Sequence, residues 1–145
     1  MNVIKIIQSD ITKIKVDAIV NPANTTLLGG GGCDGMIRNV AGLKLAEECK
    51  NLDGCKKGEA KITKGYNLPA KFIIHTVSPV FGLENGKEKE ILMNCYINSF
   101  ELAKENSIKS IAFPCIGTGC YRFPKDKAAI IATGIAQKYI NDLNN

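Results

Sequence analysis

The sequence has no tryptophan, a single histidine (His75) and only 6% aromatic residues in 145. It also has no run of 18 or more apolar residues, so we expect no membrane span. The six cysteines form no C-x-x-C pair, and one histidine cannot complete the usual ligand set for zinc. We therefore expect no bound metal and no cofactor. His75 lies in the apolar run 72–77, which favours a buried structural role over a catalytic one.

The N-terminus lacks the apolar core and the small-residue cleavage site of a signal peptide, so we expect cytoplasmic localisation and reduced cysteines. The net charge is +5, but the lysines are scattered and no aromatic residues alternate with them. A nucleic-acid partner is therefore disfavoured against an ordinary solvated surface. The length, with no repeat or linker, predicts one domain spanning residues 1–145.

Apolar runs and helical periodicity alternate along the chain. Strands are predicted at 3–7, 17–21, 59–63, 72–77 and 110–115, and helices at 35–49, at 87–104 and from 124 onward. This alternation predicts an α/β fold with a largely parallel sheet. Ligands of such sheets bind beyond the carboxyl ends of the strands.

Two glycine-rich loops follow predicted strands at that end of the sheet. The first contains Gly29, Gly30, Gly31 and Gly32, followed by Cys33 and Asp34; the second contains Gly117, Thr118, Gly119, Cys120, Tyr121, Arg122 and Phe123. Glycine lets backbone N–H groups approach an anion, and a following helix adds the partial positive charge of its N-terminus. Neither loop has a Walker or dinucleotide pattern. Together the loops predict a grip on the diphosphate of a nucleotide-like ligand.

Several polar and aromatic residues around the loops have two interpretations each. Asp34 is either a helix cap or a carboxylate that orients a water molecule. Asn24 either shapes a turn or positions a water or a ribose hydroxyl. Asp10 caps a turn or accepts from an exocyclic amine such as that of adenine. Tyr121 and Phe123 either pack against a sugar or base or close a small apolar cluster.

These stretches closely resemble the macrodomain family, in its branch of ADP-ribosyl hydrolases and O-acetyl-ADP-ribose deacetylases. The matching motifs are DIT at 10–12, VDAIVNPAN at 16–24, LLGGGGCDG at 27–35, IHTV at 74–77, IAFP at 111–114 and GTG at 117–119. The similarity extends from about residue 3 to about residue 138. The resemblance implies a three-layer α/β/α fold with a mixed, largely parallel central sheet.

The resemblance also implies a ligand, ADP-ribose or an ADP-ribosylated protein, and a role for each motif. Asp10, Ile11 and Thr12 would bind the adenine, and the second loop would wrap the diphosphate. The distal ribose would be lined by Pro22, Ala23, Asn24 and the segment from Gly29 to Asp34. Asn24 and Asp34 match the pair implicated in hydrolysis. The implied function is removal of mono-ADP-ribosyl groups from proteins, or of the acetyl ester of O-acetyl-ADP-ribose; the alternative is a non-catalytic ADP-ribose-binding module.

The chain departs from the family pattern in several places: Ser9 replaces the usual glycine before the aspartate, and Pro22 replaces an alanine. Arg38-Asn39 stands where His-Arg is common, and Gly117 replaces a serine. Where the family continues into an apolar inner strand and a closing helix, this sequence stops at 141–145. We therefore expect a sheet one strand short, with either closure around the gap or self-association at an uncovered sheet edge.

Overall fold

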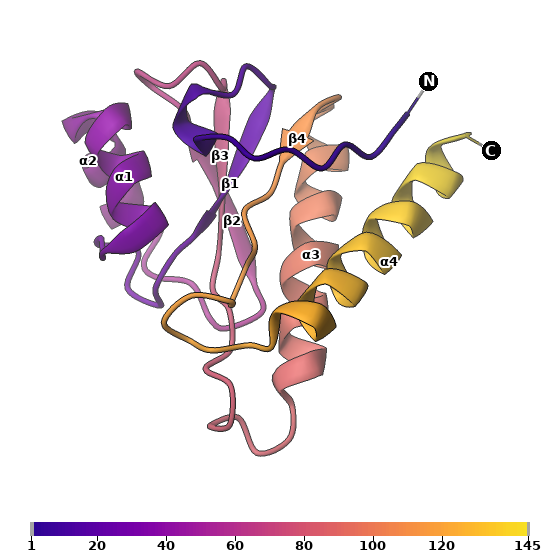
Figure 1. Cartoon of the computed structure of the whole chain (residues 1–145). Coiled ribbons are helices and arrows are strands. Elements are labelled where there is room, and N and C mark those ends of the chain that lie inside the picture. Colours follow the sequence, from indigo (N-terminus) through magenta and orange to yellow (C-terminus); the bar gives the residue numbers. More distant parts are fainter. Residues whose placement is uncertain (1, 145) are drawn as a thin grey trace.

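The computed structural model describes residues 2–144, which form three layers (Figure 1). Helices α1 (Gly32–Ala41) and α2 (Leu43–Lys50) cover one face of the sheet, and α3 (Glu88–Glu105) and α4 (Lys125–Asn144) cover the other. The strands are β1 (Ala18–Pro22), β2 (Ala60–Lys64), β3 (Phe72–Thr76) and β4 (Ile111–Ala112), and a short 3-10 helix, η1 (Ile11–Lys13), precedes β1. The predicted α/β/α class is confirmed.

The sheet has the strand order β2-β3-β1-β4. Strand β1 runs parallel to both of its neighbours, β3 and β4, while β2 is antiparallel to β3 at one edge. The carboxyl ends of β1, β3 and β4 therefore meet at one edge of the sheet. This arrangement brings the segments that follow these strands together.

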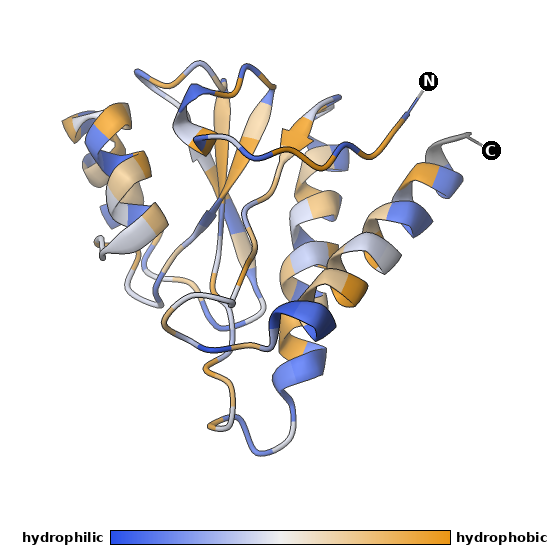
Figure 2. Cartoon of the chain, viewed as in Figure 1, coloured by the Kyte–Doolittle hydropathy of each residue, from blue (hydrophilic) through white to orange (hydrophobic). Residues whose placement is uncertain are grey.

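Two apolar cores lie on the two sides of the sheet, because successive strand residues point to opposite faces. Ala18 and Val20 of β1 pack with residues of α3 and α4, whereas Ile19 packs with residues of α1 and α2. All three are fully buried. The apolar residues of β1 are consecutive for this reason, and Figure 2 shows the hydrophobic colours along the strand. Helices on both faces account for the unbroken apolar run.

The prediction of a strand at 3–7 is wrong. This segment is extended chain without strand pairing, and Val3, Ile4, Ile6 and Ile7 are exposed, Ile6 by 88%. A strand needs a hydrogen-bonded neighbour. The edge strand β4, at the end of the sheet order opposite to β2, has only two residues in its ladder with β1. Four strands rather than five are therefore paired in the part of the chain that the structure describes.

The prediction of one helix over 35–49 is also wrong, because two helices occupy this segment. They meet at Gly42, which has a φ of 96° and a ψ of −179°. A Cβ at Gly42 would lie 2.9 Å from the Asn67 Nδ2 atom. The positive φ favours glycine, and any larger residue would also displace the Asn67 side-chain amide.

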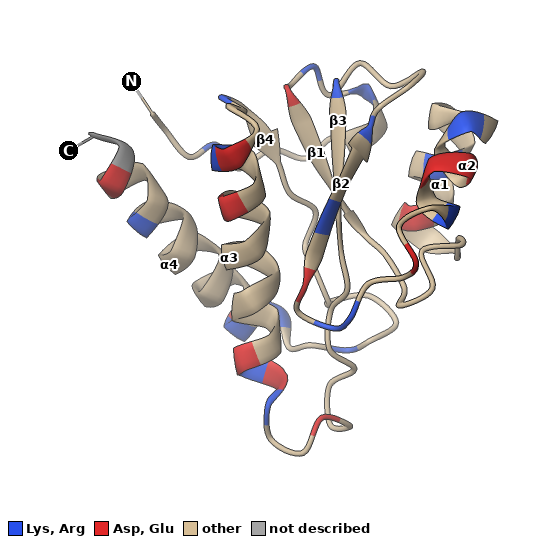
Figure 3. Cartoon of the chain, turned by 180° about the vertical axis from the view of Figure 1, so that it is seen from behind, with Lys and Arg blue, Asp and Glu red and all other residues tan. Residues whose placement is uncertain are grey.

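Basic and acidic side chains are interspersed over the helices, β2 and the loops (Figure 3). Among the residues that the structure describes, no helix has the length and apolar character needed to cross a bilayer. Self-association at the β4 edge stays a prediction.

Candidate functional site

The two glycine-rich loops lie at the same edge of the sheet. The first leaves the carboxyl end of β1 and leads into α1, and the second follows β4 and leads into α4. Because β1 and β4 are parallel neighbours, both loops start at one edge, the lower one in Figure 1. The two loops therefore come together at one end of the sheet, as the sequence predicts.

Asn24 organises the first loop through its side chain. Its Oδ1 accepts from the Leu27 backbone N–H at 3.1 Å and from the Thr26 hydroxyl at 2.8 Å, and its Nδ2 donates to the Gly29 carbonyl at 2.7 Å. Leu27 has a φ of 58° and is fully buried. Asn24 thus shapes the turn, and one N–H of its amide remains to serve a second acceptor.

Asp34 lies in the first turn of α1 and is 4% exposed. Its Oδ1 accepts from Asn21 Nδ2 at 2.7 Å and from Arg38 Nε at 2.9 Å. Its Oδ2 is buried and has no hydrogen-bond partner among the described residues. It does not cap the helix, since the N-cap is Gly31, which has no side-chain bond. Two donors hold Oδ1, so the buried Oδ2 is the carboxylate acceptor that has no partner among the described residues.

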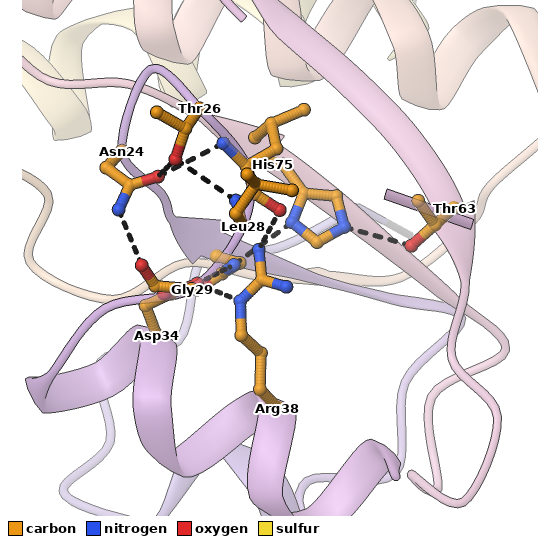
Figure 4. A network of polar contacts seen from close by, with 10 residues as sticks. Asn24, Thr26, Leu28, Gly29, Asp34, Arg38, Thr63 and His75 are labelled. Atoms are coloured by element: carbon orange, nitrogen blue, oxygen red, sulfur yellow. Dashed lines mark hydrogen bonds and ion pairs between the residues drawn. The ribbon is translucent and has the colours of Figure 1, made fainter. Parts of the chain in front are cut away.

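The structure brings Asn24 and Asp34 together at Gly30. A Cβ on Gly30 would lie 3.3 Å from Asp34 Oδ2 and 3.5 Å from Asn24 Nδ2. Both polar atoms therefore lie near one point of the loop, and a side chain at Gly30 would crowd the Asp34 carboxylate. The residue pair that the sequence marked for chemistry forms a single cluster, shown in Figure 4.

Arg38 ties the first loop to α1. Its Nε bonds the Asp34 carboxylate, and its Nη2 donates to the Leu27 carbonyl at 2.9 Å. The departure from the family pattern at this position thus supplies a cation that contacts the candidate site directly.

Sequence reasoning missed a buried polar network behind Asp34. Asn21 Nδ2 contacts His75 Nδ1 at 3.0 Å, and His75 Nε2 contacts Thr63 Oγ1 at 2.9 Å. All three residues are at most 2% exposed. Burial lowers the pKa of His75 to about 3, and the positive charge of Arg38 adds to this effect. The signal that could have revealed the network is Asn21, a polar residue that directly follows the apolar run 18–20.

Asp10, Ile11 and Thr12 lie beside the start of α1. Asp10 caps η1, because its Oδ1 accepts from the Thr12 N–H at 2.9 Å and from the Thr12 hydroxyl at 2.7 Å. These bonds hold the pKa of Asp10 below its usual value. Burial, with the negative charges of Asp34 and Asp10, raises the pKa of the Cys33 thiol. The Cys33 thiol therefore stays protonated and is no nucleophile at neutral pH.

The second loop is held by its own backbone. The Phe123 N–H donates to the Gly117 carbonyl at 2.9 Å, and Gly117 has a φ of 81°. This positive φ favours glycine where a serine is common in the family, whereas a Cβ here would make only ordinary contacts at 3.5 Å with Ser78 and Phe123. The Phe123 ring is 3% exposed and meets Phe81 edge to face at 5.3 Å. Of the two interpretations of Phe123, the structure supports the apolar cluster.

The remaining predicted residues of this region are more open. Gly119, Cys120 and Arg122 are exposed, and Thr118 and Tyr121 are half-buried. Pro22 ends β1, and the N–H of the buried Ala23 donates to the Thr76 carbonyl at 2.9 Å. Gly31 and Gly32 are exposed at the N-terminus of α1, and a Cβ on either would meet no atom within 4 Å. Unpaired N–H groups at this helix end can bind an anion.

Comparisons with known proteins show the family to which this chain belongs. A sequence profile of the Macro domain family matches residues 20–132. The chain is 54% identical over 138 residues to the ADP-ribose glycohydrolase MACROD2 of Mus musculus, covering 94% of this chain and 29% of that protein. It therefore spans less than a third of that relative's length. A Macro domain-containing protein of Methanosarcina mazei is 58% identical over 138 residues, covering 94% of this chain and 73% of the relative.

A similar structure is the Trypanosoma brucei macrodomain in complex with ADP-ribose. It has a TM-score of 0.83 and 45% sequence identity, and the match covers 88% of this chain and 53% of the other. Together with the profile match and the layered sheet, these similarities establish that the chain belongs to the macrodomain family.

Proposed function

We propose that this protein hydrolyses ADP-ribose adducts: mono-ADP-ribosyl groups on proteins, the acetyl ester of O-acetyl-ADP-ribose, or both. The observation that carries the proposal is the cluster at Gly30, where the free Asp34 Oδ2 and the Asn24 amide approach one point. The name of the MACROD2 relative and the ADP-ribose bound to the trypanosomal macrodomain support the same ligand.

The ligand would lie across the sheet edge. Backbone N–H groups of the second loop and of the N-terminus of α1 would hold the diphosphate. The distal ribose would rest on Pro22, Ala23 and the glycines of the first loop, and the adenine would lie beside Asp10. The ionised carboxylate of Asp10 can accept a hydrogen bond from the exocyclic amine.

The reacting water would bind between Asn24 and Asp34. The remaining Asn24 N–H donates to the water oxygen, and Asp34 Oδ2 accepts one water proton. The water oxygen then forms a bond to the distal ribose carbon or to the ester carbonyl carbon. The bond to the leaving oxygen breaks, that oxygen takes up a proton, and the proton on Asp34 returns to solvent.

Asp34→Asn tests the proposal, because the amide keeps an oxygen in place of Oδ1 but cannot accept the water proton. Hydrolysis should fall by about 100-fold or more, while calorimetry should show an ADP-ribose Kd within a few fold of the parent value. Glu90→Gln is the matched control, since Glu90 also lies in the first turn of a helix, α3, which follows neither glycine-rich loop. Its turnover should equal that of the parent protein.

Unchanged turnover in Asp34→Asn would exclude Asp34 from the mechanism.

The second candidate function, a non-catalytic ADP-ribose-binding module, is favoured by one observation: three hydrogen bonds within the loop already engage the Asn24 side chain. Tight ADP-ribose binding by the parent protein without turnover of either adduct would support that module.

A further inference from the structure

His75 is the one histidine of the chain, and it is fully buried in the middle of the sheet. It lies on β3, with Asn21 directly opposite on β1 and Thr63 on β2 at the other side. Its two ring nitrogens contact one of these neighbours each, as Figure 4 shows for Thr63. An apolar residue would pack here without burying two polar atoms, so packing alone does not explain the imidazole.

The hydrogen bonds give this network a direction. The Thr63 hydroxyl donates to the Lys64 carbonyl at 3.1 Å, so its oxygen accepts from the protonated Nε2 of His75. In the neutral imidazole Nδ1 then has no proton and accepts from the Asn21 amide at 3.0 Å. The other N–H of the same amide donates to Asp34 Oδ1 at 2.7 Å. Three bonds thus run from the Asp34 carboxylate to β2.

The neutral charge state of the imidazole leaves Nδ1 able to accept the hydrogen bond from Asn21. Burial lowers the pKa of His75 from 6.5 to about 3, so the ring is neutral at physiological pH. A neutral ring with its proton on Nε2 leaves the Asn21 amide only one acceptor on the β3 side, Nδ1. The opposite tautomer would place an N–H against an N–H at that contact, and the amide would have to turn away from Asp34.

We propose that Thr63 and His75 are positioning residues for the hydrolysis, which act through Asn21 to set the orientation of the Asp34 carboxylate. Asn21 and Arg38 hold Oδ1 from two directions, and Oδ2 is thereby left facing Gly30 and Asn24. This inference rests on the proposed function. It assigns part of the catalytic geometry to β2, an edge strand that β3 separates from β1.

The test removes the hydroxyl of Thr63 and keeps its shape. Thr63→Val deletes the acceptor for Nε2, and Thr63→Ser restores it. For Thr63→Val we expect kcat to fall about tenfold, with KM and the ADP-ribose Kd within twofold of the parent values, because a small misplacement of the carboxylate affects the chemical step. Thr63→Ser should recover at least about half of the parent kcat.

Thr76→Val is the matched control. Thr76 is also buried in the sheet, and its hydroxyl also bonds a backbone carbonyl, that of Glu59 at 2.8 Å, rather than a side chain of the network. The control should lose comparable stability and keep the parent kcat. A merely structural role for Thr63 would make the two valine variants alike.

The single histidine permits a direct readout by nitrogen-15 NMR, since only one imidazole gives signals. The parent protein and Thr63→Ser should show the tautomer with the proton on Nε2, and Thr63→Val should show a mixture or the opposite tautomer. The inference is overturned by a proton on Nδ1 in the parent, by an unchanged kcat in Thr63→Val, or by an equal loss in Thr76→Val. Absence of turnover in the parent protein overturns the proposed function as well.

Discussion

Because Asp34 and Arg38 form an ion pair, we expect the losses of stability on removing each charge not to add in the double variant. Arg38 Nε lies 2.9 Å from Asp34 Oδ1, and the two side chains are only 14% and 5% exposed. Removal of one member leaves the other charge without its partner, which costs about 3–5 kcal/mol in fully buried pairs. Because Arg38 retains some contact with solvent, we expect a loss of about 2–4 kcal/mol for Asp34→Asn or for Arg38→Met.

Urea unfolding of the parent, both single variants and the double variant measures this coupling. The double variant should lose about 2 kcal/mol less than the sum of the single losses, because the second deletion removes a charge already left unpaired. The pair between Lys104 and Glu101 is the control: it spans 3.8 Å between side chains that are 52% and 47% exposed. Its coupling should stay below about 1 kcal/mol. Losses at Asp34 and Arg38 that add within about 0.5 kcal/mol would show that the two charges do not stabilise each other.

Acid, backbone crowding and molecular mass provide further tests. Because burial lowers the pKa of His75 from 6.5 to about 3, only the unfolded chain takes up this proton as the pH falls below 6.5. The free energy of unfolding, measured in urea, should therefore drop by about 1.4 kcal/mol per unit from about pH 6 to about pH 5, and His75→Gln should flatten that slope. A Cβ at Gly65 would lie 2.0 Å from the Ala70 carbonyl oxygen, so Gly65→Ala should abolish or strongly lower the thermal transition in circular dichroism; Gly134→Ala, in open space on α4, should raise it. If a second copy covers the β4 edge, light scattering should give a molar mass twice the 15.7 kDa of one chain. Ile6→Lys, which places a charge on an exposed apolar residue, should then restore the mass of one chain. A monomeric parent protein would contradict this prediction.

The sequence predicted those parts of the fold that depend on local pattern. The buried strands at β1 and β3, the long helices α3 and α4, and the edge strand β2 all have their periodicity or apolar run in the residues themselves. The break at Gly42 was missed, and part of its support comes from a distant segment, where the Asn67 N–H donates to the Ala41 carbonyl at 3.3 Å. The extended segment 3–7 has a strand's composition, but pairing requires a neighbour that no local pattern reveals.

The candidate site shows the same division. Asn24, Asp34 and the glycines around them are close in sequence, and their spacing together with the family motifs marked them in advance. The network through Asn21, His75 and Thr63 joins three strands that are distant along the chain, so only the sheet register reveals it. His75 was expected to be structural because an isolated histidine in an apolar run has no visible partner. In the folded chain its partners are polar residues of the neighbouring strands.

The hydrogen bonds of Asn24 and Arg38 to Leu27 order the first glycine-rich loop before a ligand binds, which should raise the affinity for the ligand. Four consecutive glycines usually form a flexible linker, but the residues before these glycines are held in place. Leu27 is fully buried, its N–H donates to the side-chain oxygen of Asn24, and its carbonyl accepts from Arg38. Amide hydrogen exchange at Leu27 should therefore be slow for a loop position. Because this half of the loop is already ordered before a ligand arrives, binding loses less conformational entropy there, and more of the contact energy is expressed as affinity.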